Sequence, residues 1–207
     1  AQAMLAHLAH FESQGARLGR VVLDSPMAAD VTELYRRSAD FLKPEALAQA
    51  GGRLPAPSRL EFAREPEQSM ALNREQNAII LAASGMCDAG RIQHHLKHNL
   101  WRPEAQVVIV GYQAEGSIGR QLIERARAVR LLGERIAVRA QIHVLNGFSA
   151  HGDQQDLLEW LAPALRPGQR IALVHGEPPA LEAFGRVLAE RHGAAVHAPA
   201  LGETLEI

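Results

Sequence analysis

Residues 77–101, NAIILAASGMCDAGRIQHHLKHNLW, contain an apolar run, a polar turn and a helical pattern in succession. The run from Ala78 to Leu81 suits a buried strand, Ser84-Gly85 is typical of a turn, and the stretch to Trp101 has helical spacing. A strand that leads through a turn into a helix is the repeating unit of a parallel α/β sheet. This stretch therefore predicts an α/β fold.

The same succession occurs four more times along the chain. Strands are expected at residues 21–23, 107–110, 142–148 and 171–174, and helices at residues 31–42 and 118–129 and in the stretches that end at residues 165 and 192. Further strands are expected at residues 60–63, 135–139 and 196–207. The alternation predicts mainly parallel sheets with flanking helices.

The composition is that of a water-soluble globular protein, with 47% hydrophobic and 22% charged residues in a chain of 207. Its net charge of −1 means that nucleic-acid binding would need a local basic patch. The nine Phe, Trp and Tyr residues make an aromatic platform for bases a poor first hypothesis. Because there is a single cysteine, Cys87, no internal disulfide can form, and we expect a cytoplasmic protein without membrane spans.

Polar residues recur where the predicted strands end, which is where open α/β sheets bind ligands. Two of them, His151 and His175, are separated by one predicted helix, so a single βαβ unit can bring both imidazoles to one crevice. Histidine ligates zinc and exchanges protons near neutral pH. For each histidine alone, a helix cap or a loop hydrogen bond is the more economical role, and Asp153 can equally be a first-turn helix acid. The positions at these strand ends are Asp24, Ser84, Gly111, Ser149, His151 and His175.

Two glycine-containing turns are candidates for phosphate contacts. Ser84 and Gly85 precede a helix, where backbone amides can bind an anion, although an ordinary serine N-cap fits equally well. The turn that begins Gly111-Tyr112-Gln113 has neither the Walker A nor the dinucleotide-binding glycine spacing.

Other polar positions favour structural roles. His94 and His98 share a helix face but lack the glutamate of a zinc-protease helix, so we expect a solvated or partner-facing pair. Arg125, Arg127 and Arg130 are expected on solvated faces, and Cys87 in the core.

Five segments, in this order, resemble the metallo-β-lactamase/β-CASP family of nucleases, which includes ribonuclease J and the endonuclease of the cleavage and polyadenylation machinery. These segments are VVLDSPMA, EQSMALNREQNAIILAASGMCDAGRIQHHLKHNL, VVIVGYQAEGSIGR, GFSAHGD and LVHGEP. The resemblance implies a zinc-dependent hydrolase that cleaves RNA phosphodiester bonds, with RNA as its partner. Two zinc ions would activate the water.

In this resemblance, His175 matches the family's motif C histidine, a ligand of one zinc, and His151 matches motif B, which protonates the leaving group. DNA-directed members carry valine at motif C, so His175 favours RNA. Tentative contacts to the RNA backbone are Ser84, Gly85, Gly111, Tyr112, Gln113 and Ser149.

The family fold places a β-CASP domain inside a metallo-β-lactamase domain. By this resemblance, residues 1–147 are a β-CASP domain, incomplete at its N-terminus, and residues 148–207 are the C-terminal segment of the lactamase domain. The family's HxHxDH zinc motif is absent from the chain. We therefore expect a missing N-terminal lactamase half as a partner, and a fragment that is inactive and holds no stable zinc by itself.

Two alternatives remain open at this point. One is a non-catalytic nucleic-acid or protein-binding module of β-CASP type. A second is a small-molecule α/β enzyme, which the absent phosphate-loop fingerprints disfavour. A homo-oligomer is compatible with either reading of the sequence.

Overall fold

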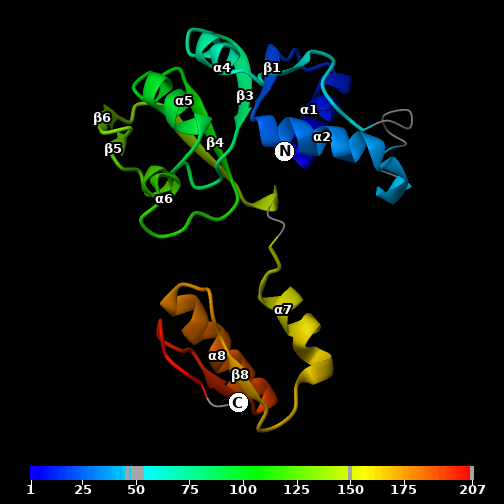
Figure 1. The fold of residues 1–207 in the computed structure, drawn as a ribbon, viewed down its shortest axis with the longest axis vertical. Helices are drawn as coiled ribbons and strands as arrows, with labels where there is room; N and C mark the ends of the chain where they lie inside the picture. The colour runs from blue at the N-terminus through cyan, green and yellow to red at the C-terminus, as the bar shows by residue number, and fades with distance from the viewer. Residues whose placement is uncertain (45–46, 48–53, 149–150, 206–207) are drawn as a thin grey trace. The chain divides into compact units, whose positions relative to one another are not determined.

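The structure is a computed structural model that describes residues 1–44, 47, 54–148 and 151–205. The chain divides into two compact units, Ala1–Phe148 and Ser149–Ile207, called here the first and second unit (Figure 1). Among these described residues, three of the four sheets are parallel and carry flanking helices, which confirms the predicted fold class. The assignment of residues 1–147 and 148–207 to two family domains stays a prediction.

A three-stranded parallel sheet in the order β2-β1-β3 begins the first unit. Its strands are β1 (Arg20–Asp24), β2 (Leu60–Phe62) and β3 (Ala78–Ala82). Successive side chains of the central strand point to opposite faces. Val21 and Leu23 pack against helix α1 (Gln2–Ser13), while Val22 packs against Leu72 of helix α4 (Pro66–Leu72). Helix α2 (Pro26–Arg37) directly follows β1, and its N-cap is Ser25.

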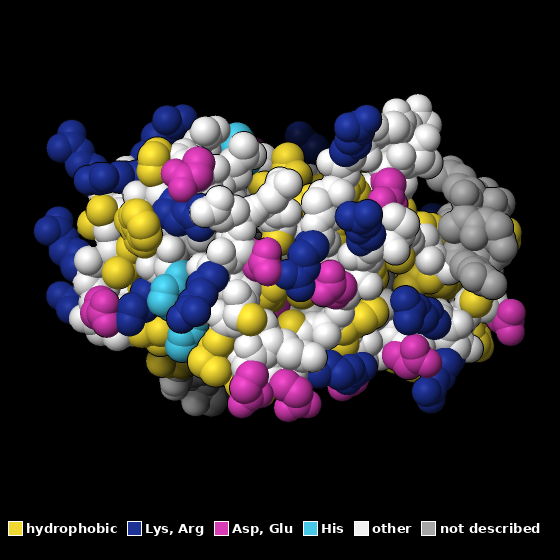
Figure 2. Space-filling model, turned by 90° about the horizontal axis from the view of Figure 1, so that it is seen from above, with side chains coloured by type: hydrophobic (Ala, Val, Ile, Leu, Met, Phe, Trp, Pro, Cys, Tyr) yellow, Lys and Arg dark blue, Asp and Glu magenta, His cyan; other side chains and the backbone are white. Residues whose placement is uncertain are grey.

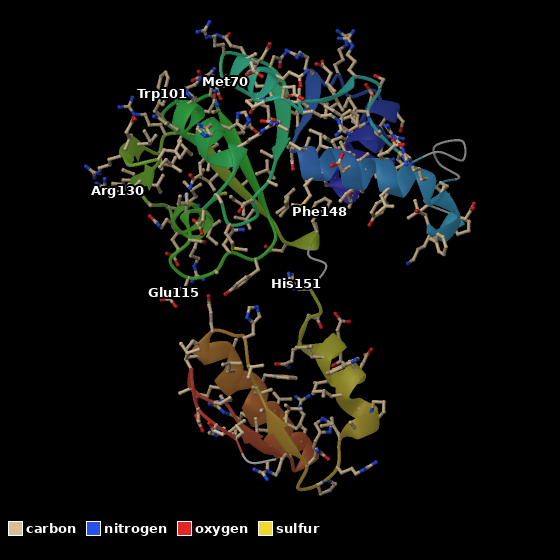
Figure 3. All side chains as sticks on the ribbon, in the orientation of Figure 1. Met70, Trp101, Glu115, Arg130, Phe148 and His151 are labelled. Atoms are coloured by element: carbon tan, nitrogen blue, oxygen red, sulfur yellow. The ribbon has the colours of Figure 1, made fainter. Side chains whose placement is uncertain are left out.

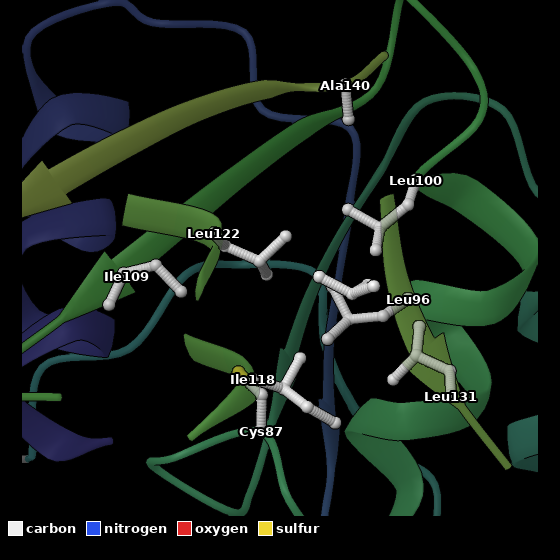
Figure 4. Packing of buried hydrophobic residues seen from close by; sticks show 9 residues of the cluster. Cys87, Leu96, Leu100, Ile109, Ile118, Leu122, Leu131 and Ala140 are labelled. Carbon is white, nitrogen blue, oxygen red and sulfur yellow. The ribbon is translucent and has the colours of Figure 1, made fainter. Parts of the chain in front are cut away.

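The rest of the first unit is built around a parallel pair and a hairpin. Strands β4 (Gln106–Val110) and β7 (Gln141–Leu145) are parallel, and β5 (Ala128–Leu131) and β6 (Glu134–Ala137) are antiparallel. Helices α5 (Arg91–Asn99) and α6 (Ile118–Ile123) pack with them. Figure 4 shows the shared core, whose members include Leu96, Leu100, Ile109, Leu122 and Leu131.

Cys87 belongs to this core, which confirms its predicted packing role. Burial, with a smaller effect from the Asp88 carboxylate, raises the pKa of the Cys87 thiol to about 11. The thiol is therefore protonated at neutral pH and is a poor nucleophile.

Several predicted boundaries are wrong. The helix expected over residues 118–129 ends at Ile123, because Arg125 has a left-handed backbone and β5 begins at Ala128. The helix expected at residues 31–42 is α2, which begins at Pro26, followed by a short 3₁₀ turn, η1 (Ala39–Phe41). The strand expected to reach residue 148 stops at Leu145, where the 3₁₀ turn η2 (Asn146–Phe148) begins.

The second unit has its own small core. Helix α7 (Gln154–Leu161), the 3₁₀ turn η3 (Ala162–Ala164) and helix α8 (Pro178–His192) accompany the parallel strands β8 (Arg170–Ala172) and β9 (Ala195–His197). The buried residues Leu158, Leu173, Leu188 and Ala194 form the core. The strand expected at 196–207 is therefore shorter than predicted, since β9 ends at His197. In the described part of the chain, no helix is long and apolar enough to span a membrane.

Candidate functional site

Two loops of the first unit, which follow the C-terminal ends of β3 and β4, are bonded to each other. The amide Nε2 of Gln113 donates to the carbonyl oxygen of Gly85 at 3.0 Å and to that of Tyr112 at 2.9 Å. The backbone N–H of Ala114 donates to the sulfur of Met86 at 3.2 Å. The structure thus joins two groups of predicted phosphate contacts, Ser84-Gly85 and Gly111-Tyr112-Gln113. We call residues 83–90 and 111–117 the joined loops.

Gly119 makes this close packing possible. A Cβ atom at position 119 would lie 1.6 Å from Oε1 of Gln113. Only 3% of Gln113 is exposed, and its Oε1 has no hydrogen-bond partner among the described residues. Gln113 is therefore held by its amide nitrogen and by packing against Gly119.

The first amides of helix α6 are already occupied. The N–H groups of Ile118, Gly119 and Arg120 donate to Asp88 Oδ1 (2.8 Å), Met86 O (3.0 Å) and Ser117 Oγ (3.1 Å). A phosphate at the joined loops would therefore meet loop groups rather than this helix terminus.

Ser84 is not a helix cap. The N-cap of α5 is Gly90, six residues after Ser84, and Gly90 has a left-handed φ of 75°. The serine N-cap considered from the sequence is therefore wrong, and the Ser84 side chain, which is partly exposed, has no capping role. Tyr112, in the partner loop, is 56% exposed and presents an aromatic ring to solvent.

Asp24, which the sequence placed among the ligand-facing strand ends, is instead fully buried. Its Oδ2 accepts from Ser69 Oγ at 2.6 Å and lies 2.5 Å from His95 Nε2, and its Oδ1 accepts from Arg91 Nη1 at 2.7 Å. Arg91 also donates to the carbonyl oxygens of Ala63 and Arg64. The carboxylate therefore links β1 to α4 and α5 through hydrogen bonds. Because it is fully buried, it is not accessible to a ligand.

The environment of Asp24 favours its charged form. Burial is the largest influence and acts to raise the pKa, but hydrogen bonds from Ser69, His95 and Arg91 together hold the pKa of this carboxyl below its ordinary value. Sequence reasoning missed these partners because they are 45 to 71 residues away from Asp24. By contrast, His94 and His98 are exposed, as predicted for a solvated pair.

The two catalytic candidates lie in the second unit. His175 follows β8 and is exposed, with a left-handed φ of 63°. In the part of the chain that the structure describes, the His175 side chain has no hydrogen-bond or ion-pair partner. His151 is also exposed and lies on the segment before α7 (Figure 3). Ser149 lies outside the described residues.

Asp153 has the helix-capping role that was the alternative to orienting an imidazole. Its Oδ1 accepts from the N–H groups of Gln155 (2.8 Å) and Asp156 (3.0 Å). In return, the N–H of Asp153 donates to Oδ2 of Asp156 at 2.9 Å. This capping box begins α7 and fixes the chain just after His151.

No group of three or more His, Cys, Asp or Glu side chains able to hold a metal occurs among the described residues. His175 is available as a single donor, because its ring is exposed and unengaged there. Zinc sites in enzymes use about three protein ligands. The described residues therefore supply one ligand of such a zinc site.

Comparisons with known proteins place these features in a family. Residues 1–122, which contain the joined loops and the Asp24 cluster, match the Beta-Casp domain family. The chain belongs to the β-CASP family. Residues 135–199, which contain both His151 and His175, match a second family described as a Zn-dependent metallo-hydrolase RNA specificity domain.

The relatives of this β-CASP chain include proteins named as a ribonuclease, a transcription termination factor and an RNase J-like protein. It is 45% identical over 184 residues to Ribonuclease TTHA0252 of Thermus thermophilus, which covers 86% of this chain and 42% of the relative. It is 29% identical to Transcription termination factor FttA of Pyrococcus abyssi, over 70% of this chain and 23% of the relative. An RNase J-like protein of Methanocaldococcus jannaschii is 30% identical, over 70% of this chain and 33% of the relative. The chain thus spans less than half the length of these relatives.

Proposed function

We propose that this chain is part of a zinc-dependent ribonuclease that hydrolyses RNA phosphodiester bonds. The observation that carries the proposal is His175, an exposed imidazole with no side-chain partner among the described residues, held on a left-handed turn after β8. A residue in this backbone region is uncommon, and such strain often accompanies a functional role. The similarity to Ribonuclease TTHA0252 supports the reaction class.

His175 is the residue of this chain that would hold zinc. A neutral imidazole is among the commonest zinc ligands, and an exposed ring without a competing bond can meet the metal directly. Zinc, when bound, supplies positive charge at the phosphate and a water of lowered pKa. The remaining ligands come from outside this chain, so the chain by itself is proposed to be inactive.

His151 is proposed as the general acid. A histidine donates and accepts protons near neutral pH, and its exposed position lets its ring meet a phosphodiester. The Asp153 capping box holds the backbone two residues later, which limits the positions that His151 can take. In its protonated form the ring would give its proton to the leaving oxygen.

The joined loops are proposed as contacts to the RNA backbone. Ser84 offers a hydroxyl, Gly85 and Gly111 leave room for a phosphate, and Tyr112 offers a half-exposed ring for stacking. Gln113 is assigned a different role from the one predicted, because its buried amide joins the two loops. Gln113 would therefore hold the two loops in position without contacting the RNA itself.

The test compares His151→Ala with His175→Ala in the complete protein. Loss of His175 should lower both the zinc content and the rate, because a ligand is removed. Loss of His151 should slow cleavage by about 100- to 10,000-fold while most zinc stays bound, because a general acid is removed. Elemental analysis gives zinc per protein, and single-turnover cleavage of a labelled RNA gives the rate. His192→Ala, in the last turn of α8, is a matched control that should change neither quantity.

Two outcomes would contradict these roles. If His151→Ala empties the zinc site and His175→Ala leaves it full, the assignments are reversed. If neither variant slows cleavage by tenfold, which corresponds to about 1.4 kcal/mol of barrier, both histidines are structural. A complete protein that binds RNA but holds no zinc would favour the binding-module alternative.

A further inference from the structure

The hairpin of β5 and β6 carries an arginine-rich surface. Residues 125–139, RARAVRLLGERIAVR, contain five arginines and one glutamate in a chain whose net charge is −1. Figure 2 shows Lys and Arg side chains gathered, with histidines, over the side of the first unit where Figure 1 places this hairpin. We propose that this hairpin and the adjacent Trp101 bind single-stranded RNA.

Strand pairing brings the arginine side chains together. Arg130 of β5 is directly opposite Arg135 of β6. Val129 and Leu131 are buried, so the alternating residue Arg130 faces outward, and Figure 3 shows it projecting from the molecule. Arg139 continues the outward alternation of Arg135 and is exposed. Like charges directly opposite each other destabilise a hairpin, so an anion bound at this arginine pair would offset that cost.

The acidic side chains nearby do not provide that anion. Glu134, the one acid within the hairpin, is bound by Lys97 of α5 at 2.6 Å. Glu104 is bound by Arg102 at 3.0 Å, and Glu124 is bound by Arg120 at 2.5 Å. Within the described ranges, the guanidinium groups of Arg130, Arg135 and Arg139 therefore have no carboxylate partner. Arg130 donates to a carbonyl oxygen of its own turn, at Gly133.

An exposed tryptophan lies at the edge of this surface. The carbonyl oxygen of Leu100 accepts from the N–H groups of Arg139 (2.7 Å) and Ala140 (2.9 Å), so the backbone of Trp101 runs beside that of Arg139. Trp101 is 54% exposed, although its neighbour Leu100 is fully buried. Figure 3 shows Trp101 and Arg130 at the same end of the first unit.

The combination of these groups identifies the partner. Guanidinium groups bind phosphates and stack on bases, and an exposed indole offers a face for any unpaired base. A duplex would hide its base faces from Trp101, whereas a flexible single strand can meet the arginines and the ring together. An acidic protein segment would satisfy the arginines but would leave the indole without a stacking partner. Single-stranded RNA therefore fits both parts of the surface.

The test is binding of a fluorescein-labelled oligouridine, about 20 nucleotides long, to the 207-residue chain in the presence of EDTA. The variant Arg130→Gln/Arg135→Gln/Arg139→Gln should bind about tenfold or more weakly, and its log K against log salt slope should be shallower by about 2, since each phosphate contact contributes about 0.7. The matched control, Arg17→Gln/Arg59→Gln/Arg74→Gln, removes the same charge from exposed positions outside the hairpin and should bind normally. Circular dichroism checks that each variant is folded.

A second pair of variants isolates the stacking contribution. Trp101→Leu should weaken binding about 5- to 150-fold without changing the salt slope, and Trp101→Phe should recover most of the affinity. Equal losses in the two triple variants, no RNA binding by the chain, or tighter capture of polyglutamate than of RNA would each overturn the proposal. The inference rests on RNA as the proposed substrate class, but EDTA removes zinc chemistry from the assay. Failure here would leave the nuclease proposal standing, and failure of cleavage would not affect this result.

Discussion

At the scale of single residues, the buried carboxylate of Asp24 connects three elements that are distant in sequence. Ser69 on α4 and Arg91 and His95 on α5 all bond to it. A buried charge is costly unless it is paired and hydrogen-bonded, and each oxygen of Asp24 has a donor within 2.7 Å. We infer that Asp24 sets the position of α5, and hence of the loop between β3 and α5.

We predict that Asp24→Asn destabilises the first unit by about 3 kcal/mol at pH 7, because it leaves Arg91 without its charge partner. The value is at the low end for a broken buried pair, since Arg91 keeps two carbonyl acceptors. Urea unfolding followed by circular dichroism measures the change. Asp30→Asn, which breaks an exposed pair with Arg64, is the matched control and should cost about 0 to 1 kcal/mol. Equal effects of both substitutions would contradict the anchoring role of Asp24.

The same comparison has a predictable pH dependence. The pKa of Asp24 is lower in the folded protein than its ordinary value, so the folded state binds this proton more weakly than the unfolded chain. The stabilisation is fully present above the unfolded pKa of about 4 and is lost as the pH falls through the folded pKa. The difference in stability between the wild type and Asp24→Asn should therefore be constant from about pH 5 to 7 and shrink below about pH 4. A difference that shrank between pH 5 and 7 would assign the effect to another group.

The sequence indicated the candidate residues of the site, but it did not predict their hydrogen-bond partners. Ser84, Gly85, Gly111 and Gln113 are candidates because they follow predicted strands, and the structure joins their loops. Gln113 joins the two loops while its side chain packs against Gly119, and the linear sequence does not show this contact. The sequence places Asp24 among the ligand-facing strand ends because it does not show that helices bury this carboxylate.

At the scale of elements, the joined loops depend on a close approach between α6 and Gln113. The φ of Gly119 lies outside the left-handed region, so the requirement for glycine is space rather than backbone conformation. The N–H of Gly119 also donates to Met86 of the opposite loop at 3.0 Å. One residue thus contributes both a bond and the space that Gln113 occupies.

We predict that Gly119→Ala destabilises the first unit by about 1 to 3 kcal/mol, because the new methyl group would overlap the Gln113 carboxamide. Gly147→Ala, where a Cβ would meet nothing within 4 Å, is the control and should be nearly neutral. Thermal or urea unfolding gives the free energies. The double variant Gln113→Ala/Gly119→Ala should be more stable than the sum of the single changes predicts, because truncation removes the overlap. Additive effects would show that Gly119 is required for another reason.

The sequence predicted the helices and strands correctly where their apolar pattern is strong. It predicted their boundaries wrongly where a turn ends the element. The core strands of the first unit were found at the correct places because their apolar runs are continuous, as in Val21, Val22 and Leu23. The hairpin was only half predicted, since residues 118–129 form a plausible helix until the left-handed backbone of Arg125 ends it. Arginine rarely adopts a left-handed backbone, so the presence of Arg125 does not predict the end of the helix. Arg125, Arg127 and Arg130 are exposed, as predicted, but the position of Arg130 opposite Arg135 was not predicted.

At the scale of the whole molecule, the metal site is proposed to be shared between this chain and further protein. This chain offers His175 as one ligand, and its described residues contain no cluster of three donors. The relative named Ribonuclease TTHA0252 has more than twice the length that the chain covers, since coverage is 42%. The proposed division of labour is that this chain presents RNA contacts, one ligand and one acid to a zinc site completed elsewhere.

We therefore predict that the purified 207-residue chain does not retain stoichiometric zinc after dialysis and does not cleave RNA. A single imidazole cannot hold the metal against dilution, because enzyme zinc sites use about three protein ligands. Elemental analysis and a labelled single-stranded RNA measure the two quantities, and a His151→Ala/His175→Ala preparation controls for contaminating nucleases. Metal-dependent cleavage by the wild-type chain that disappears in the double variant would contradict the shared site. Because the hairpin surface needs no zinc, the same preparation should still bind the RNA, which separates loss of the metal from loss of the fold.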